Sequence, residues 1–289
     1  MNATNTPDEE WLFEIKPKSS NFSLQLGEVW RYRDLLFLFV KRNVVTLYKQ
    51  TILGPLWYLI QPLFTAITFT LIFNKVAGIA TGTVPPFLFN LAGIITWNYF
   101  TACVTDTSDT FKSNASIFGK VYFPRLIMPL ATVITNLIKL GIQCLIFIGF
   151  YIFFYFQGMS NTFSVYTLFF PLLVMIMGVL GLSLGMIISS MVTKYRDLTF
   201  LVGFGMQLLM YLSAVMYPIA LMQEKMPELA AWVQYNPLAY VIETSRFMLL
   251  GAGEVSVLGL VYTVTITIIL FLFGLIVFNR TEKSFIDTV

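Results

Sequence analysis

Residues 47–63 read LYKQTILGPLWYLIQPL, and here a charged segment of the chain gives way to a long apolar one. Lys49 is the last charged residue before Lys75, and the interval between them can cross a bilayer, which takes about 20 residues. Gly54 and Pro55 stand at the joint, where the first turn of a helix tolerates a proline that donates no hydrogen bond. This stretch predicts a surface helix that turns at Gly54-Pro55 and enters a membrane.

The composition points to the same class of protein. The 289 residues are 57% hydrophobic and only 11% charged, whereas charged residues make up about a quarter of an ordinary soluble domain. We therefore expect one integral membrane domain. The sequence has no histidine, which removes the commonest metal ligand and general base, so we expect no catalytic or metal site. Cys103 and Cys144 fall inside predicted spans and are interpreted as small packing residues, not as a disulfide.

The segments before the membrane domain differ in character. Residues 1–27 are polar and contain no apolar run, which predicts a cytoplasmic tail without a cleaved signal peptide. Residues 28–49 predict an amphipathic interface helix, because apolar residues from Trp30 to Leu47 recur at spacings of seven, three, four and three. Its basic residues favour an anionic inner leaflet, so it is either a plain anchor or also a contact for a cytoplasmic partner.

Residues 50–289 predict a membrane domain with six spans, at residues 53–75, 86–111, 126–156, 165–192, 199–218 and 257–279. Lys and Arg gather in the segments that follow the second, fourth and sixth spans, so the positive-inside rule places both termini in the cytoplasm. Residues 219–256 contain Pro227 and Pro237 and predict one or two short helices in a re-entrant outer segment that borders a pathway. The expected fold is an all-α integral membrane protein.

Two basic loops could contact a partner. The first contains Lys120, Tyr122, Phe123, Pro124 and Arg125. Its aromatic residues either sit at the membrane interface or dock into a groove of another protein. Gly119-Lys120 does not complete a phosphate-binding loop, because Asn occupies position 114 and Val121 follows the lysine, so ATP hydrolysis requires another chain. The second loop contains Tyr195, Arg196 and Asp197 and is either an ordinary loop or a second contact.

Aromatic residues and rare charges mark candidate positions inside the membrane. Six aromatic residues of the first two spans could face lipid or line a path for sugars, whose apolar faces stack on rings: Tyr58, Phe64, Phe69, Trp97, Tyr99 and Phe100.

Charged residues within the membrane are costly and usually functional. Lys139 is expected to meet Asp106 or Asp109 or to reach a water-filled path. Glu243 and Arg246 stand three residues apart, and they either form an ion pair or line a channel exit.

Glycines in the fourth span form a second kind of pattern. Gly181 and Gly185, with Gly178 nearby, are typical of close helix packing, within the chain or between two copies.

Several of these residues resemble the signature of polysaccharide-exporting ABC permeases, the membrane subunits for O-antigen, capsule and teichoic-acid export. The likeness covers most of the chain. It is carried by Tyr48, Leu53-Gly54, Leu56-Trp57 and Pro62-Leu63, by the K-x-x-FPR run from Lys120 to Arg125 with Pro129, by Arg196-Asp197, and by Asn236-Pro237 with Arg246-Phe247.

The resemblance implies a homodimer in the bacterial inner membrane. Two separate nucleotide-binding ATPase subunits would bind ATP and Mg and contact both basic loops, with Gly54-Pro55 as a hinge. The substrate would be an undecaprenyl-linked glycan moved to the periplasm, and no nucleic acid is expected. Alternatives are teichoic-acid or lipid and drug export. A membrane-embedded transferase is disfavoured, because the sequence has no histidine and residues 50–289 contain no adjacent carboxylates.

Overall fold

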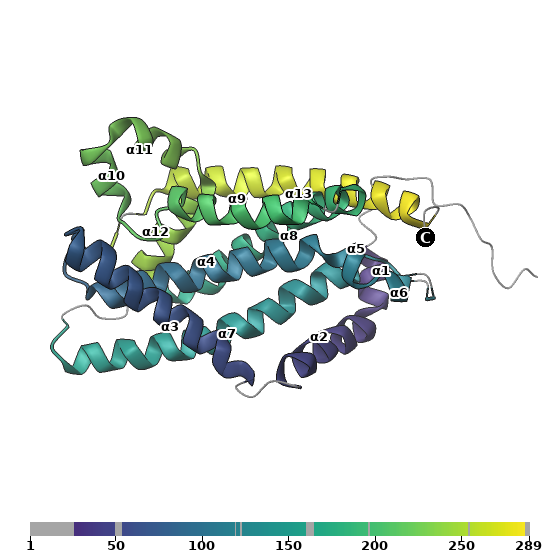
Figure 1. Ribbon diagram of the computed structural model, residues 1–289, viewed down its shortest axis with the longest axis horizontal. Coiled ribbons are helices and arrows are strands. Elements are labelled where there is room, and N and C mark those ends of the chain that lie inside the picture. Colours follow the sequence, from purple (N-terminus) through teal and green to yellow (C-terminus); the bar gives the residue numbers. More distant parts are fainter. Residues whose placement is uncertain are drawn as a thin grey trace, which may run out of the picture.

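The computed structural model describes residues 26–49, 54–118, 120–121, 123–159, 165–195, 197–253 and 255–286, and over these ranges the protein is all-helical, without strands (Figure 1). Within them, five helical segments are long and apolar enough to cross a membrane. They are Trp57–Val76, Pro86–Ser108, Ile127–Phe156, Val165–Lys194 and Val257–Thr281. The predicted helical membrane fold is therefore confirmed.

The described chain begins with α1 (Leu26–Arg31) and α2 (Arg33–Tyr48), so the segment expected as one helix over residues 28–49 is divided in two at Tyr32, and its place at the membrane interface stays a prediction. The short turn η1 (Gly54–Leu56) leads into α3 (Trp57–Phe69), which continues as the π-helical η2 (Thr70–Val76). The other long helices are α4 (Pro86–Ser108), α7 (Ile127–Phe156), α8 (Phe170–Lys194, preceded by η3, Val165–Phe169) and α13 (Val257–Ile286). Two single-turn helices, α5 (Thr110–Ser113) and α6 (Ala115–Phe118), lie between α4 and α7.

The segment predicted as the fifth span is shorter than expected. Helix α9 (Leu198–Leu212) has 15 residues and is therefore about 22 Å long, less than the roughly 30 Å of a bilayer core. The six-span count stays a prediction. Residues 219–256, for which one or two short helices were expected, hold three: α10 (Ile219–Lys225), α11 (Pro227–Gln234) and α12 (Pro237–Leu250). Pro227 and Pro237 each begin a helix, because proline fits the first helical turn and interrupts a continuing one.

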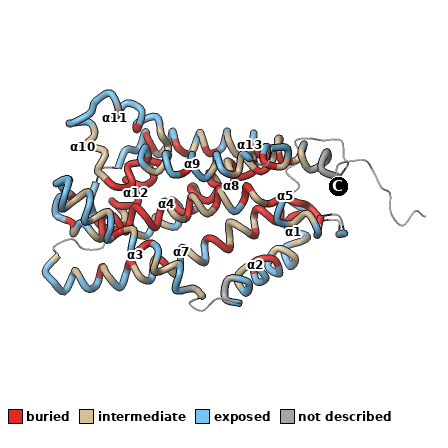
Figure 2. Tube along the Cα trace, in the orientation of Figure 1, coloured by how far each residue is buried: buried red, intermediate tan, exposed pale blue. Residues whose placement is uncertain are grey.

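Helix α4 is the centre of the fold and is buried along most of its length (Figure 2). It packs against α3, α7, α8 and α12. The three glycines of α8 make its approach possible, since a Cβ atom on Gly185 would lie 2.5 Å from the Cβ of Thr107, and one on Gly181 would lie 2.7 Å from the Cβ of Cys103. The glycine pattern therefore serves packing within the chain.

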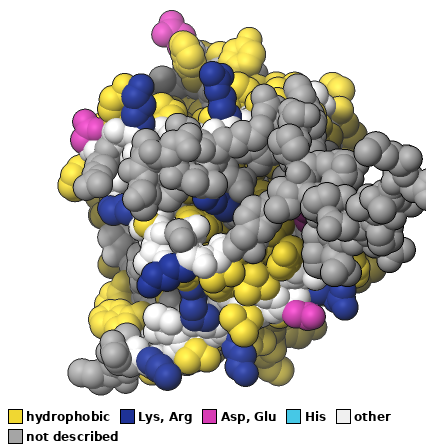
Figure 3. All heavy atoms as spheres, turned by 90° about the vertical axis from the view of Figure 1, so that its right-hand side faces the viewer, with side chains coloured by type: hydrophobic (Ala, Val, Ile, Leu, Met, Phe, Trp, Pro, Cys, Tyr) yellow, Lys and Arg dark blue, Asp and Glu magenta, His cyan; other side chains and the backbone are white. Residues whose placement is uncertain are grey.

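The two ends of the helical bundle differ in charge. Helices α10, α11 and α12 lie at one end, whereas α1, α5 and α6 lie at the other, near the end of α13 (Figure 1). Lys and Arg side chains outnumber acidic ones on the face formed by that second end (Figure 3). This distribution agrees with the basic loops read from the sequence.

Candidate functional site

A polar groove of about 240 Å³ opens between the membrane-spanning helices α3, α4 and α7. Its polar lining residues are Tyr58 and Gln61 of α3, Asn98, Tyr99, Thr101, Thr105 and Asp106 of α4, and Asn136, Lys139 and Gln143 of α7. Polar side chains inside a membrane domain are costly and typically face a water-filled space or substrate path. The groove is therefore the first candidate for the functional site.

Contacts among its side chains tie the three helices together. The Lys139 Nζ atom lies 3.3 Å from Asp106 Oδ2 and 5.4 Å from the centre of the Tyr58 ring. The side-chain amide of Gln143 donates a hydrogen bond of 3.2 Å to the backbone oxygen of Tyr58. The prediction that Lys139 meets an aspartate of the preceding span is confirmed for Asp106.

Two buried groups of the groove are not satisfied by the protein. The hydroxyl of Thr101 makes no hydrogen bond to a described residue, and the side-chain amide of Asn136 has only the weakly hydrogen-bonding thiol of Cys103 beside it. A buried polar group without a partner costs about 1–3 kcal/mol, so both groups favour a bound hydroxyl or water. With Lys139 and Asp106, which are 17% and 44% exposed, the groove offers donors and acceptors suited to a hydroxyl-rich ligand.

The predicted path-lining aromatic residues separate into two sets. Tyr58 lies in the groove, and Phe64 on α3 is exposed. Phe69 is half-buried and packs edge-on against Phe73 at 5.6 Å.

The aromatic residues of α4 lie inside the protein. Trp97 and Phe100 are buried and contact each other at 5.7 Å, so these two rings reach no surface of this chain. Tyr99 is also buried, although it contributes to the wall of the groove. Of the six aromatic residues predicted to line a path, the candidates that remain are Tyr58, Tyr99, Phe64 and Phe69.

The joint between α2 and α3 has the backbone that the sequence indicates. Gly54 has φ of +48°, in the left-handed region that favours glycine, and it opens the turn that leads into α3. Residues 50–53 and the Pro55 side chain lie outside the described part of the chain. A role of Gly54-Pro55 as a hinge stays a prediction.

The first basic loop packs into its own chain. Phe123 is only 3% exposed, and its ring lies 5.6 Å from that of Phe39 on α2 and 5.8 Å from that of Phe118. Phe111 and Phe278 extend this aromatic cluster to the end of α13. The ring of Phe123 thus joins α2 to the membrane domain and is not free to dock into a partner.

Other residues of this loop divide between core and surface. Pro124 and Arg125 are buried, and the Arg125 guanidinium lies 5.1 Å from the centre of the Phe118 ring. Lys120 and Val121 are exposed, and Tyr122 lies outside the described residues. Among the described residues of this loop, Lys120 and Val121 are therefore exposed for a direct contact with a partner, and a coupling role of the loop stays a prediction.

Helix α2 is bound to the same loop region by polar contacts. Arg42 Nη2 donates a hydrogen bond of 3.3 Å to Asn114 Oδ1, and its guanidinium lies 4.9 Å from the Phe39 ring. Burial there lowers the pKa of Arg42 from its ordinary value. These contacts make α2 and the first basic loop one structural unit.

The second basic loop is at the surface. Tyr195 and Asp197 are exposed, and Lys194 Nζ lies 5.2 Å from the centre of the Tyr195 ring. Arg196 lies outside the described residues. The surface position is compatible with a partner contact, which stays a prediction.

Arg246 and Glu243 form the predicted ion pair on α12, at the end of the bundle that holds α10 and α11. Arg246 Nη1 lies 3.3 Å from Glu243 Oε2, and the guanidinium also donates hydrogen bonds of 2.8 Å and 2.5 Å to the backbone oxygens of Ala214 and Val215. Arg246 is fully buried, over the ring of Phe89, so it holds the turn after α9 and lines no open path. Glu243 lines a cavity at this end of the protein.

Regularly spaced polar residues within two apolar spans could have predicted the groove from the sequence. On α4, Asn98, Thr101 and Thr105 recur at spacings of three and four, and on α7 Asn136 and Gln143 stand seven apart on either side of Lys139. Such spacings place polar residues on one helical face. A search for polar stripes within the apolar spans would have found these residues.

The chain belongs to the ABC-2 type transporter family, whose model matches residues 34–250. It is also similar to an O-antigen export system permease protein RfbA of Klebsiella pneumoniae, with 28% identity over 88% of this chain and 94% of the relative. A permease of the same name from Myxococcus xanthus is 26% identical over 68% of this chain and 74% of the relative. The family makes the chain a transport membrane subunit, not a catalytic enzyme.

Proposed function

We propose that this protein is the membrane subunit of an ABC exporter that moves an undecaprenyl-linked O-antigen, or a closely similar surface polysaccharide, across the bacterial inner membrane. The observation that carries the proposal is the polar groove between α3, α4 and α7, because it offers hydrogen-bonding groups to a glycan within an apolar domain. Support comes from the names of the relatives, which match this chain over nearly their whole length.

The energy would come from another chain. The sequence lacks a phosphate-binding loop, so a separate ATPase subunit, present in two copies, would bind ATP and Mg. A polymer longer than the membrane is thick needs a continuous path, and two copies of the permease would enclose it. The exposed aromatic residues of α3 and the groove would face that path.

Coupling would run through the unit formed by α2 and the first basic loop. The ATPase would contact the described residues of the two basic loops that are exposed, which are Lys120, Val121, Tyr195 and Asp197. Because Phe123 packs on Phe39 of α2, a displacement of the loop would carry α2 with it. The joint at Gly54 would pass this motion to α3.

The proposed topology has six spans and both termini in the cytoplasm. Helix α9 would be the fifth span, short because the buried turn from Ser213 to Met216 and the re-entrant helices α10–α12 complete the crossing. The test uses single cysteines at Lys120 and Glu224 in a variant without Cys103 and Cys144. A membrane-impermeant maleimide should label position 224 in intact spheroplasts and position 120 only in inverted vesicles, and the reverse pattern would overturn the topology.

The function itself is tested with the permease and its ATPase purified as a complex. Undecaprenyl-linked O-antigen from the source strain should stimulate ATP hydrolysis, whereas undecaprenyl phosphate, which lacks the glycan, should not. A strain without the permease should lose surface O-antigen and regain it with the wild-type protein. Normal surface O-antigen in the deleted strain, or stimulation by lipid or drug substrates alone, would refute the proposal.

A further inference from the structure

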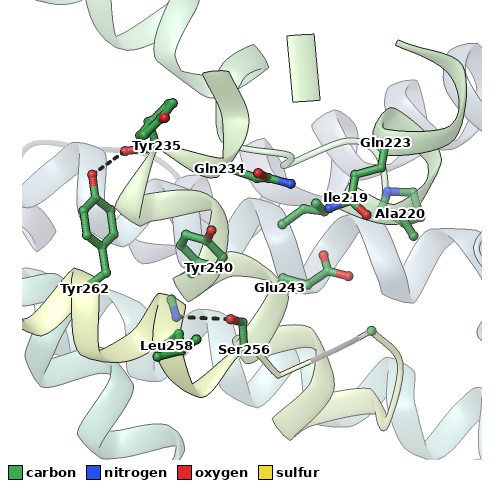
Figure 4. A pocket seen from close by; sticks show the side chains of 13 residues that line it. Ile219, Ala220, Gln223, Gln234, Tyr235, Tyr240, Glu243, Ser256, Leu258 and Tyr262 are labelled. Carbon is green, nitrogen blue, oxygen red and sulfur yellow. Dashed lines mark hydrogen bonds between the residues drawn. The ribbon is translucent and has the colours of Figure 1, made fainter. Parts of the chain in front are cut away.

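A cavity of about 880 Å³ lies at the outer end of the protein, remote from the basic end, between α10–α12 and the start of α13. Figure 4 shows the side chains that surround it. Its polar side chains carry two amides, three phenols, one hydroxyl and one carboxylate, from Gln223, Gln234, Tyr235, Tyr240, Tyr262, Ser256 and Glu243. Its volume lies in the range of about 300–1,000 Å³ that small-molecule sites occupy.

The carboxylate of Glu243 is held in a fixed position. Arg246 Nη1 lies 3.3 Å from its Oε2 atom, and Arg246 is itself fixed by the backbone oxygens of Ala214 and Val215. The other oxygen, Oε1, faces Gly253, where a Cβ atom would approach it to 2.8 Å. The paired guanidinium favours the ionised carboxylate, which is a strong hydrogen-bond acceptor.

Two of the three tyrosines, Tyr240 and Tyr262, give the cavity aromatic surface in a defined position. The Tyr240 ring packs closely against the backbone of Gly259, and a Cβ atom at that glycine would collide with the ring. The Tyr262 hydroxyl donates a hydrogen bond of 2.9 Å to the backbone oxygen of Tyr235. Rings fixed in this way can stack on an apolar face of a ligand with little loss of side-chain entropy.

The charge of the cavity excludes one class of ligand. None of the described residues that line it is Lys or Arg, and the guanidinium of Arg246 is fully buried behind Glu243. A phosphate or an anionic headgroup would approach the Glu243 carboxylate here and meet no Lys or Arg among the described lining residues. Neutral hydroxyl groups can donate to the Glu243 carboxylate and bond both glutamine amides.

We propose that the outer cavity binds a neutral sugar unit of the exported glycan after it has crossed the membrane. The inference rests on the proposed function, because it takes the exported polysaccharide as the ligand. The carboxylate and amides would bond the sugar hydroxyls while a tyrosine ring covers an apolar face. A site at this end retains sugars that have emerged and so opposes their return.

The test measures binding of two probes to the complete transporter complex in nanodiscs by isothermal titration calorimetry. One probe is the O-polysaccharide released from the source strain's lipopolysaccharide by mild acid, and the other is glycerol 1-phosphate, which represents a phospholipid headgroup. Glu243→Gln should raise the Kd for the polysaccharide about tenfold, because a hydrogen bond to a charged group is lost. The control Glu228→Gln alters an exposed glutamate of α11 outside the cavity and should leave the Kd unchanged.

A second variant protects the test against a folding defect of Glu243→Gln. Gln234 is exposed at the cavity rim, so Gln234→Ala should fold normally and raise the Kd about fivefold. Binding of glycerol 1-phosphate alone, or a Kd unchanged in both cavity variants, would overturn the inference. If O-antigen still reaches the cell surface in that case, the proposed function stands and only the outer site is refuted.

Discussion

Replacing Phe123 by alanine should destabilise the protein itself, beyond any effect on a partner. The ring is 3% exposed and lies within 6 Å of the rings of Phe39 and Phe118. Truncating a buried phenylalanine to alanine costs about 3–5 kcal/mol, which combines lost burial with the cavity left behind. Val121→Ala is the matched control, because Val121 is 57% exposed in the same loop and its truncation should change stability by less than about 0.5 kcal/mol.

A double-mutant cycle identifies where the ring of Phe123 is bound. Phe39→Ala removes the α2 side of the contact, and the pair should show a coupling energy of about 0.5–1.5 kcal/mol, typical of neighbouring aromatic rings. Stability is followed by denaturant unfolding of the purified permease in detergent, and coupling by the ATPase rate of the complex. A Phe123→Ala protein with unchanged stability and additive effects, but weakened copurification with the ATPase, would refute the packing argument and place the ring at the partner interface.

Three further outcomes are expected. Gly185→Ala should lower the thermal unfolding midpoint, because overpacking costs about 1–3 kcal/mol, whereas Gly203→Ala, with open space around it, should not; equal midpoints would contradict the α4–α8 packing. Lys139→Met should lower the transport rate about tenfold and Lys139→Arg much less, since a charged hydrogen bond partly screened by solvent is lost; equal rates in reconstituted vesicles would exclude a role of the charge. Cysteines at Tyr58 and Gln143, joined by a short bifunctional reagent, should block export, and undiminished export after cross-linking would show that the groove stays closed during transport.

Most of the helical fold could be predicted from the sequence. The third predicted span, residues 126–156, matches α7 within one residue, because a long apolar run between charged or polar loops leaves little choice of boundaries. The outer segment was harder to divide. Whether Pro227 ends one helix or begins the next depends on the packing of its neighbours, and proline is compatible with both.

The sequence allowed the kinds of residue at the site to be predicted, but not where their side chains point. A lysine midway along an apolar span indicated a partner at Asp106 or Asp109 or a water-filled path, and the structure pairs Lys139 with Asp106. The direction of an aromatic ring is decided by which helices cover it, so Trp97 and Phe100 could not be separated from Phe64 by sequence alone. Phe123 shows the same limit of sequence analysis. An aromatic residue in a basic loop can dock into a partner or pack against its own chain, and only the structure shows that this ring packs against Phe39 of α2.

The packing indicates which helix of the groove would be displaced with the smaller loss of contacts. Of the most apolar stretch of α4, 78% of the residues are buried inside the protein. In the corresponding stretch of α3 and η2 the buried share is only 11%. Displacing α4 would separate the glycine contacts with α8 and disturb Arg246, which lies over Phe89 of α4 and beside Gly93. Displacing α3 next to the groove breaks the hydrogen bond from Gln143 and the contact of Lys139 with the Tyr58 ring, each worth roughly 0.5–2 kcal/mol. A nucleotide-driven motion that reaches α3 through α2 and the Gly54 joint would therefore open the groove against the smaller resistance, with α4 as the fixed wall of the path.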